Sequence, residues 1–138
     1  MRMSEIYTLE ISQVDLKNRT IFLDKTKNGS KWQVPMTSDI YKALSEYLLK
    51  LNSEKLFSFE GNRKDISSRL SQTFGRVFKA ANCGNFTFHY LRHEATSRFY
   101  ERTTLTDLEI AKILGWKSLK MALTYTNLRA SNLAVKLW

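Results

Sequence analysis

The sequence predicts an α+β fold: a mainly α-helical domain with a small three-stranded antiparallel sheet near its N-terminus. One observation is that short runs of β-branched and aromatic residues with alternating character occupy the chain before residue 37. A second is that apolar residues recur at helical spacing from there onward. A third is that no tract rich in Pro, Gly or Ser divides the 138 residues, a length suited to one domain with a hydrophobic core. We therefore expect one compact domain.

Residues 1–9 have the spacing of a short helix, and the strands follow it. Three runs predict the strands: 11–16, 20–23 and 31–36. Asn28 and Gly29, between the second and third runs, tolerate the positive φ of a hairpin turn. Pro35 cannot donate a ladder hydrogen bond, and its place near the end of the third run suits a strand edge rather than its centre.

Six helices are expected after the sheet, and most of them have a capping signal. They cover 40–51, 66–81 and 88–101, a short stretch ending at Gly115, a stretch that follows Ser118 and contains Tyr125, and 131–138. Thr37, Ser38 and Asp39 are candidate N-caps for the first of them. Gly84 is a candidate left-handed cap after the second. Thr106 and Glu109 have the spacing of a capping box.

The charge balance points to nucleic acid. Lys and Arg total 22 against 13 Asp and Glu, which gives a net charge of +9 and a pI near 9.8. A folded basic domain is typical of nucleic-acid binding. No apolar run approaches 18 residues and no signal peptide or lipidation signal is evident, so we expect no membrane association. Cys83 is the single cysteine and has no partner for a disulfide, which favours a reducing cytoplasm.

His89 and Arg92 are one helical turn apart and share a face, so both side chains can point into one cavity. Arginine binds phosphate oxygens through a planar fork, and histidine exchanges protons near neutral pH. Taken alone, the pair also fits a solvated surface feature. His89 and His93 have a spacing that suits two zinc ligands, but the chain lacks the glutamate between them, so we expect no metal.

Lys27 lies in the predicted hairpin, and Arg2 lies at the start of the chain. A lysine there can reach a DNA backbone or donate a proton to a leaving oxygen, although most lysines in turns are simply solvated. Neither residue is informative by itself.

Together, five motifs resemble those of the tyrosine recombinases, or phage integrases, whose catalytic fold is also similar to that of type IB topoisomerases. The resemblance spans Arg2 to about Leu128, with every motif in order. The motifs are Arg2-Met3-Ser4-Glu5-Ile6, Thr26-Lys27-Asn28-Gly29 with Val34-Pro35-Met36, His89-Tyr90-Leu91-Arg92-His93, Leu114-Gly115-Trp116, and Tyr125 nine residues after the tryptophan.

The resemblance implies a site-specific recombinase that cleaves and rejoins DNA. Tyr125 would attack a DNA phosphate and form a 3′-phosphotyrosine intermediate, and Arg2 and Arg92 would clamp the non-bridging oxygens. Lys27 would protonate the departing 5′-oxygen, and His89 would assist proton transfer or bind the phosphate. This scheme requires no cofactor and no metal.

Trp116 departs from the histidine that is most frequent at its position in the family. Its indole N–H can only donate, so it can hold a phosphate oxygen but cannot act as a base. Simple core packing after the Gly115 cap is the other interpretation, and the two are compatible.

The resemblance also implies parts that the chain lacks. Family members carry a separate N-terminal DNA-gripping domain, so we expect 1–138 to be a catalytic domain truncated at its N-terminus, folded but poorly active alone. The expected partners are double-stranded DNA and, for the full-length protein, three further copies in a tetramer on DNA; the fragment alone would be a monomer. A bacterial or phage-encoded protein of the cytoplasm, from a mobile element, is expected.

Basic residues outside the motifs are candidates for contacts with the DNA backbone. They are Lys31, Arg63, Lys64, Arg76, Lys117 and Lys120. Two other functions stay open. Residues 105–128 also fit a helix-turn-helix of a non-enzymatic DNA-binding regulator, and a type IB topoisomerase would share the chemistry. The DNA target, and the choice among integration, excision, inversion and resolution, are not encoded in any motif.

Overall fold

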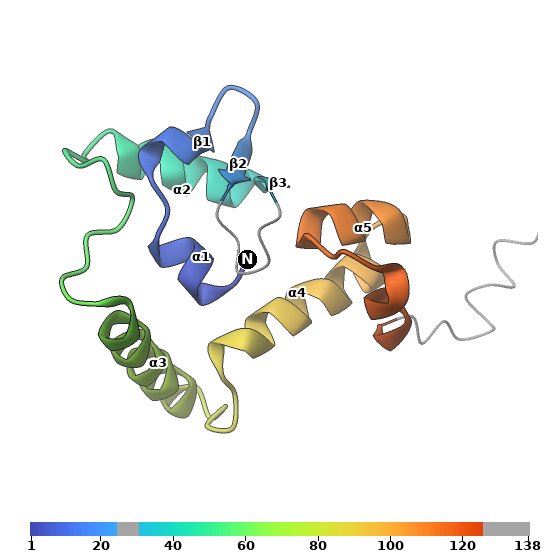
Figure 1. The fold of residues 1–138 in the computed structure, drawn as a ribbon. Coiled ribbons are helices and arrows are strands. Elements are labelled where there is room, and N and C mark those ends of the chain that lie inside the picture. Colours follow the sequence, from blue (N-terminus) through green and yellow to red (C-terminus); the bar gives the residue numbers. More distant parts are fainter. Residues whose placement is uncertain (25–30, 126–138) are drawn as a thin grey trace, which may run out of the picture. The chain divides into compact units, whose positions relative to one another are not determined.

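The protein is described here by a computed structural model that covers residues 1–24 and 31–125 (Figure 1). The predicted fold class is confirmed, because the described elements are mainly helices and one three-stranded antiparallel sheet lies near the N-terminus. The chain forms two compact units, Met1–His93 and Glu94–Trp138. Within the described residues, no helix is both long enough and apolar enough to cross a membrane.

The elements run as follows, with η denoting a 3₁₀ helix: α1 Met3–Tyr7, η1 Ile11–Gln13, β1 Val14–Asp15, β2 Thr20–Leu23, β3 Trp32–Pro35, α2 Ser38–Leu48, α3 Arg63–Ala80, α4 Phe88–Arg102, α5 Asp107–Leu114 and η2 Leu119–Thr124.

The sheet has the order β1-β2-β3, and Ile21 of β2 pairs with Val14 on one side and Val34 on the other. Pro35 lies at the end of β3 as predicted, and β3 is an edge strand of the sheet. The first strand is shorter than expected because its first half is η1. Gln13 accepts the backbone N–H of Glu10 and donates to the Phe22 carbonyl, and these side-chain bonds favour a local turn over an extended strand.

The core of the first unit lies between the sheet and α2. Its buried cluster consists of Leu9, Ile21, Leu23 and Leu56, and Leu44 of α2 is among the residues packed against them. The N-terminus of α2 is capped as predicted, since the Thr37 hydroxyl accepts the N–H of Ile40.

A backbone bridge joins the segment after α1 to the segment before α3. Glu10 and Lys55 form the bridge, and the N–H of Leu56 donates to the carbonyl of Leu9 at 2.9 Å. The N–H of Ile11 donates in turn to the carbonyl of Glu54, also at 2.9 Å. Leu9 and Leu56 therefore meet in the core although the sheet and α2 lie between them in sequence.

The end of α3 differs from the prediction. The left-handed residue is Asn82, with φ of 58°, and not Gly84. The N–H of Cys83 donates to the carbonyl of Phe78 at 2.7 Å and that of Asn82 to Lys79 at 3.1 Å, which is a Schellman cap with asparagine in the left-handed position. Asparagine tolerates this conformation, so no glycine is needed there.

The second unit is built on α5. Ile110, Ala111 and Leu114 are buried, with Ala122 of η2. The capping box between Thr106 and Glu109 is present as predicted.

The helix expected to contain Tyr125 ends one residue before it, because η2 stops at Thr124 and Tyr125 is its C-cap. The expected turn at Asn28 and Gly29 and the expected helix 131–138 lie outside the described residues.

Candidate functional site

Arg2 is held by a buried carboxylate. Glu5 is 6% exposed, its Oε1 lies 2.8 Å from Nη1 of Arg2, and its Oε2 accepts the backbone N–H of Arg2 at 2.6 Å. Glu5 comes three residues later on α1, so one helical turn brings the carboxylate to both groups. This double contact fixes the position of Arg2 and leaves part of its guanidinium fork for another anion.

His89 and Arg92 lie on the first turns of α4, as their spacing predicts. Burial lowers the pKa of His89, and the positive charges of His93, Arg92 and Arg2 lower it further. The imidazole of His89 is therefore neutral at lower pH than a free histidine, and a neutral imidazole can accept a proton.

Arg2, His89 and Arg92 line one cavity of about 320 Å³ in the first unit. Hydroxyl groups complete its polar lining, and none of its described lining residues is acidic. The hydroxyl groups belong to Ser4, Ser67, Ser71 and Thr87. Two arginines and several hydroxyl donors without a lining carboxylate suit an anion with several oxygens, such as a phosphodiester.

A second cavity of the first unit, of about 380 Å³, has a different character. Glu5, Glu10 and Asp24 line it beside Lys55 and Arg63, with aromatic rings between them. Carboxylates facing this space would repel a phosphate, which makes the cavity of Arg2 and Arg92 the better anion site.

Tyr125 and Trp116 lie together in the second unit. Their ring centroids are 5.8 Å apart and the ring planes differ by 21°, so the rings stack. Tyr125 stacks also on Tyr100 of α4, with a centroid distance of 6.3 Å and an interplanar angle of 7°. All three residues are half-buried.

The chain reversal at Gly115 places Trp116. Gly115 has φ of 66°, a left-handed conformation that glycine adopts without strain, and the N–H of Trp116 donates to the carbonyl of Ala111 at 2.9 Å. The Leu-Gly-Trp motif is thus the cap of α5, and the tryptophan is the first residue beyond it.

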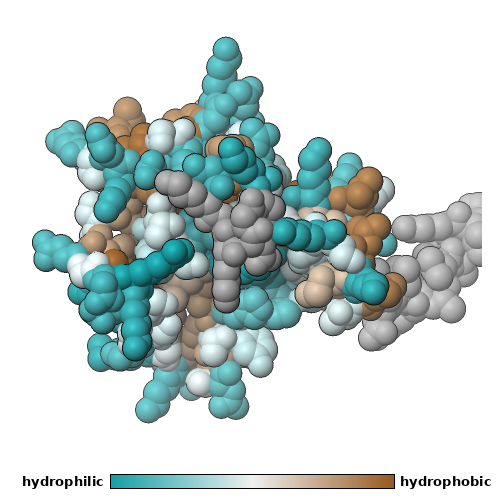
Figure 2. Space-filling model, in the orientation of Figure 1, coloured by the Kyte–Doolittle hydropathy of each residue, from teal (hydrophilic) through white to brown (hydrophobic). Residues whose placement is uncertain are grey.

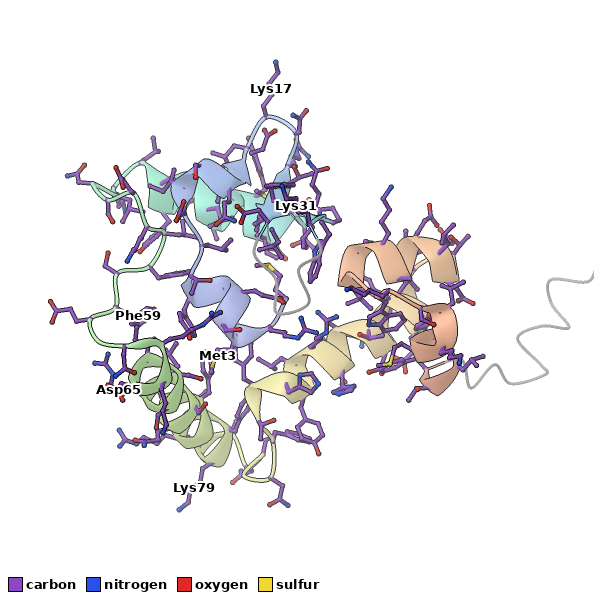
Figure 3. The ribbon with its side chains drawn as sticks, in the orientation of Figure 1. Met3, Lys17, Lys31, Phe59, Asp65 and Lys79 are labelled. Carbon is purple, nitrogen blue, oxygen red and sulfur yellow. The ribbon has the colours of Figure 1, made fainter. Side chains whose placement is uncertain are left out.

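The other predicted residues are dispersed. Lys27 lies outside the described residues. The six candidate DNA-backbone contacts, Lys31, Arg63, Lys64, Arg76, Lys117 and Lys120, are all exposed. Lys31 precedes β3, and Lys17 extends from the turn between β1 and β2 (Figure 3). Hydrophilic side chains cover much of the visible face (Figure 2).

The zinc interpretation concerned His89 and His93, whose ring centroids are 4.7 Å apart in an edge-to-face arrangement. Across residues 1–24 and 31–125, no three side chains of His, Cys, Asp or Glu are grouped as a metal site requires.

Two residues in contact with predicted ones, one in each unit, had no predicted role. Glu5 belongs to the first motif, and a carboxylate one turn after a functional arginine is a detectable signal. Tyr100 lies outside every motif, and no spacing in the sequence marks it as a neighbour of Tyr125.

The fold is that of the tyrosine recombinases. The crystal structure of XerA recombinase superposes with a TM-score of 0.74 at 26% identity, covering 98% of this chain and 51% of that one. The XerH site-specific recombinase bound to its difH substrate gives a TM-score of 0.75 at 20% identity, with coverage of 99% and 42%, a likeness of fold alone.

The family model named Phage integrase family matches residues 1–132. A shufflon-specific DNA recombinase of Escherichia coli is 34% identical over 137 residues, which is 99% of this chain and 34% of that protein. The chain belongs to the phage integrase family, and it spans about a third of the length of that curated relative.

Proposed function

We propose that residues 1–138 act as the catalytic domain of a site-specific recombinase that cleaves and rejoins DNA through a 3′-phosphotyrosine intermediate. The observation that carries this proposal is the convergence of Arg2, His89 and Arg92 on one cavity whose described lining residues include no carboxylate. These residues come from segments nearly ninety positions apart, and a shared anion site is a simple reason for bringing them together. The kinship to a shufflon-specific DNA recombinase and to XerA recombinase supports the same reaction class.

The reaction is an exchange of one phosphodiester bond for another. The Tyr125 oxygen attacks the phosphorus, a bond forms between them, and the bond from phosphorus to the 5′-oxygen breaks. The phenol proton passes to neutral His89, and Lys27 gives a proton to the departing 5′-oxygen. A 5′-hydroxyl of another strand reverses these steps, so rejoining needs no nucleotide cofactor.

Arg2 and Arg92 stabilise the charge that builds on the non-bridging oxygens in the transition state. Their planar forks match two phosphate oxygens at a time. The indole N–H of Trp116 is a further donor to the same phosphate group, and its ring supports the ring of Tyr125.

The partner is double-stranded DNA, bound through the exposed basic residues and the cavity of Arg2 and Arg92. Strand exchange between two DNA sites calls for four nucleophiles, so we propose a tetramer as the working assembly. Such a protein would be encoded by a bacterium, a phage or another mobile element carried by a bacterium. It would act on DNA in the bacterial cytoplasm.

The test is a covalent adduct. The chain is incubated with nicked suicide duplexes tiled over the DNA that flanks its gene, and adducts are resolved under denaturing conditions. We expect an adduct that resists denaturation and disappears in Tyr125→Phe, while both proteins bind the duplex equally. A DNA-binding regulator would bind in both forms and give no adduct, which would refute the proposal. Relaxation of a supercoiled plasmid without a specific site would instead indicate a topoisomerase.

A further inference from the structure

The ring of Tyr125 is nearly parallel to two other rings of the second unit. Trp116, its neighbour across 5.8 Å, belongs to a family motif. Tyr100 lies 6.3 Å away and is closer to parallel, with an angle of 7°. The Tyr125 ring is therefore stacked on a residue to which no role has been assigned.

Tyr100 is itself fixed by its surroundings. It lies near the C-terminal end of α4 and is half-buried. Burial raises the pKa of its hydroxyl, and the negative charge of Asp107 adds to this effect. A half-buried aromatic ring on a regular helix offers a large apolar face against which a second ring can stack.

Tyr125 lies where a short element ends. It follows the short 3₁₀ helix η2, and its backbone N–H donates to the carbonyl of Ala122 at 2.9 Å. A tyrosine at the end of a 3₁₀ turn could adopt several rotamers, and only a ring aimed at the phosphorus is reactive.

We infer that Tyr100 is a positioning residue for the nucleophile, holding the Tyr125 ring by stacking in one rotamer before and after cleavage. The inference rests on the proposed function, since it gives Tyr100 a part in the same reaction. Tyr100 acts through Tyr125 and not on the DNA, so its ring is needed and its hydroxyl is not.

Restricting the nucleophile in advance removes an entropic cost from the chemical step and leaves the binding step unchanged. Contact between two aromatic rings stabilises their arrangement in addition to the effect of the buried area. Converted to a rate, this added stabilisation is worth up to roughly tenfold. Loss of the Tyr100 ring should therefore lower the cleavage rate about tenfold with the Kd for DNA unchanged.

The experiment compares three variants of the full chain under single-turnover conditions with the suicide duplex. Tyr100→Leu removes the ring, Tyr100→Phe keeps it, and Phe99→Leu removes a half-buried ring from the preceding position of α4. We expect about tenfold slower adduct formation only for Tyr100→Leu, with equal DNA affinity for all three. In the DNA-free chain, the Tyr125 ring-proton resonances should move in Tyr100→Leu and stay in Tyr100→Phe.

Two results would overturn the inference and leave the proposed function standing. One is wild-type cleavage by Tyr100→Leu. The other is an equal loss in Tyr100→Leu and Phe99→Leu, which would indicate general destabilisation. A wild-type chain that forms no adduct would instead overturn the proposed function, and the role of Tyr100 with it.

Discussion

At the scale of single residues, Arg2 and Glu5 are joined by two hydrogen bonds. A buried carboxylate is costly unless it is paired, and Arg2 pairs Glu5 through both its backbone and its side chain. The pair thus has two consequences. The positive charge of Arg2 balances the negative charge of Glu5 at the start of α1, and the two bonds fix the orientation of the Arg2 side chain. The arginine could be predicted from the sequence, whereas the burial of its partner could not.

His89 gives the residue-scale prediction. If its neutral form accepts the Tyr125 proton, adduct formation falls as pH drops through the His89 pKa, which lies below the ordinary 6.5. His93→Asn removes one positive charge that lowers this pKa, so the acidic limb of kcat/KM should move to higher pH. The profile of kcat/KM reports the DNA-free protein, the state to which the pKa shift applies.

His93→Lys is the matched control for that experiment, because it keeps a positive charge at the same position. Its acidic limb should stay near that of the wild type. Profiles that coincide for His93→Asn and the wild type would contradict proton transfer through His89.

How far the site could be predicted differs from residue to residue. Spacing along the chain was sufficient to predict that His89 and Arg92 share one face of a helix, which is α4. Convergence of Arg2 on the same cavity depends on packing between α1 and later helices, which no local pattern encodes. Tyr100 was missed for the same reason, since its contact with Tyr125 comes from tertiary structure.

At the scale of elements, the start of α3 shows what determines the ends of a helix. The core of α3 was predicted from its apolar spacing, but the helix begins three residues earlier, at Arg63. Asn62 is the cause, since its side chain accepts the N–H groups of Lys64 and Asp65 at 3.0 Å. Periodicity locates the buried face of a helix, whereas side-chain caps determine its ends, and so boundaries are the less predictable part.

This cap gives the element-scale prediction. Asn62→Ala leaves two N–H groups of α3 without their acceptor and should lower the free energy of unfolding by about 1 kcal/mol. Asn62→Gly should cost only about a few tenths of a kcal/mol, since glycine exposes these groups to water. Urea unfolding followed by circular dichroism measures both. An equal loss in the two variants would argue against a capping role.

At the scale of the whole molecule, the net charge of +9 should make DNA binding depend strongly on salt. Each basic residue that neutralises a phosphate adds roughly one to the slope of log K against log salt. Lys31→Ala and Arg76→Ala should therefore each reduce the steepness of that slope by about one. Binding titrations between low and moderate salt measure this effect.

Lys17→Ala removes an equally exposed lysine that is outside the proposed DNA-contacting set, and it should leave the slope unchanged. Equal slopes for all the variants and the wild type would show that Lys31 and Arg76 are ordinary surface charges. Neither outcome depends on cleavage, so the assignment is tested separately from the chemistry.

The backbone bridge between Glu10 and Lys55 has a consequence for how this domain can vary. It closes a chain loop that encloses the whole sheet and α2. Because the entropy of closure grows only with the logarithm of loop length, doubling the loop costs about 0.6 kcal/mol. Residues can therefore be inserted in the turn between β1 and β2 while Leu9 and Leu56 continue to meet in the core.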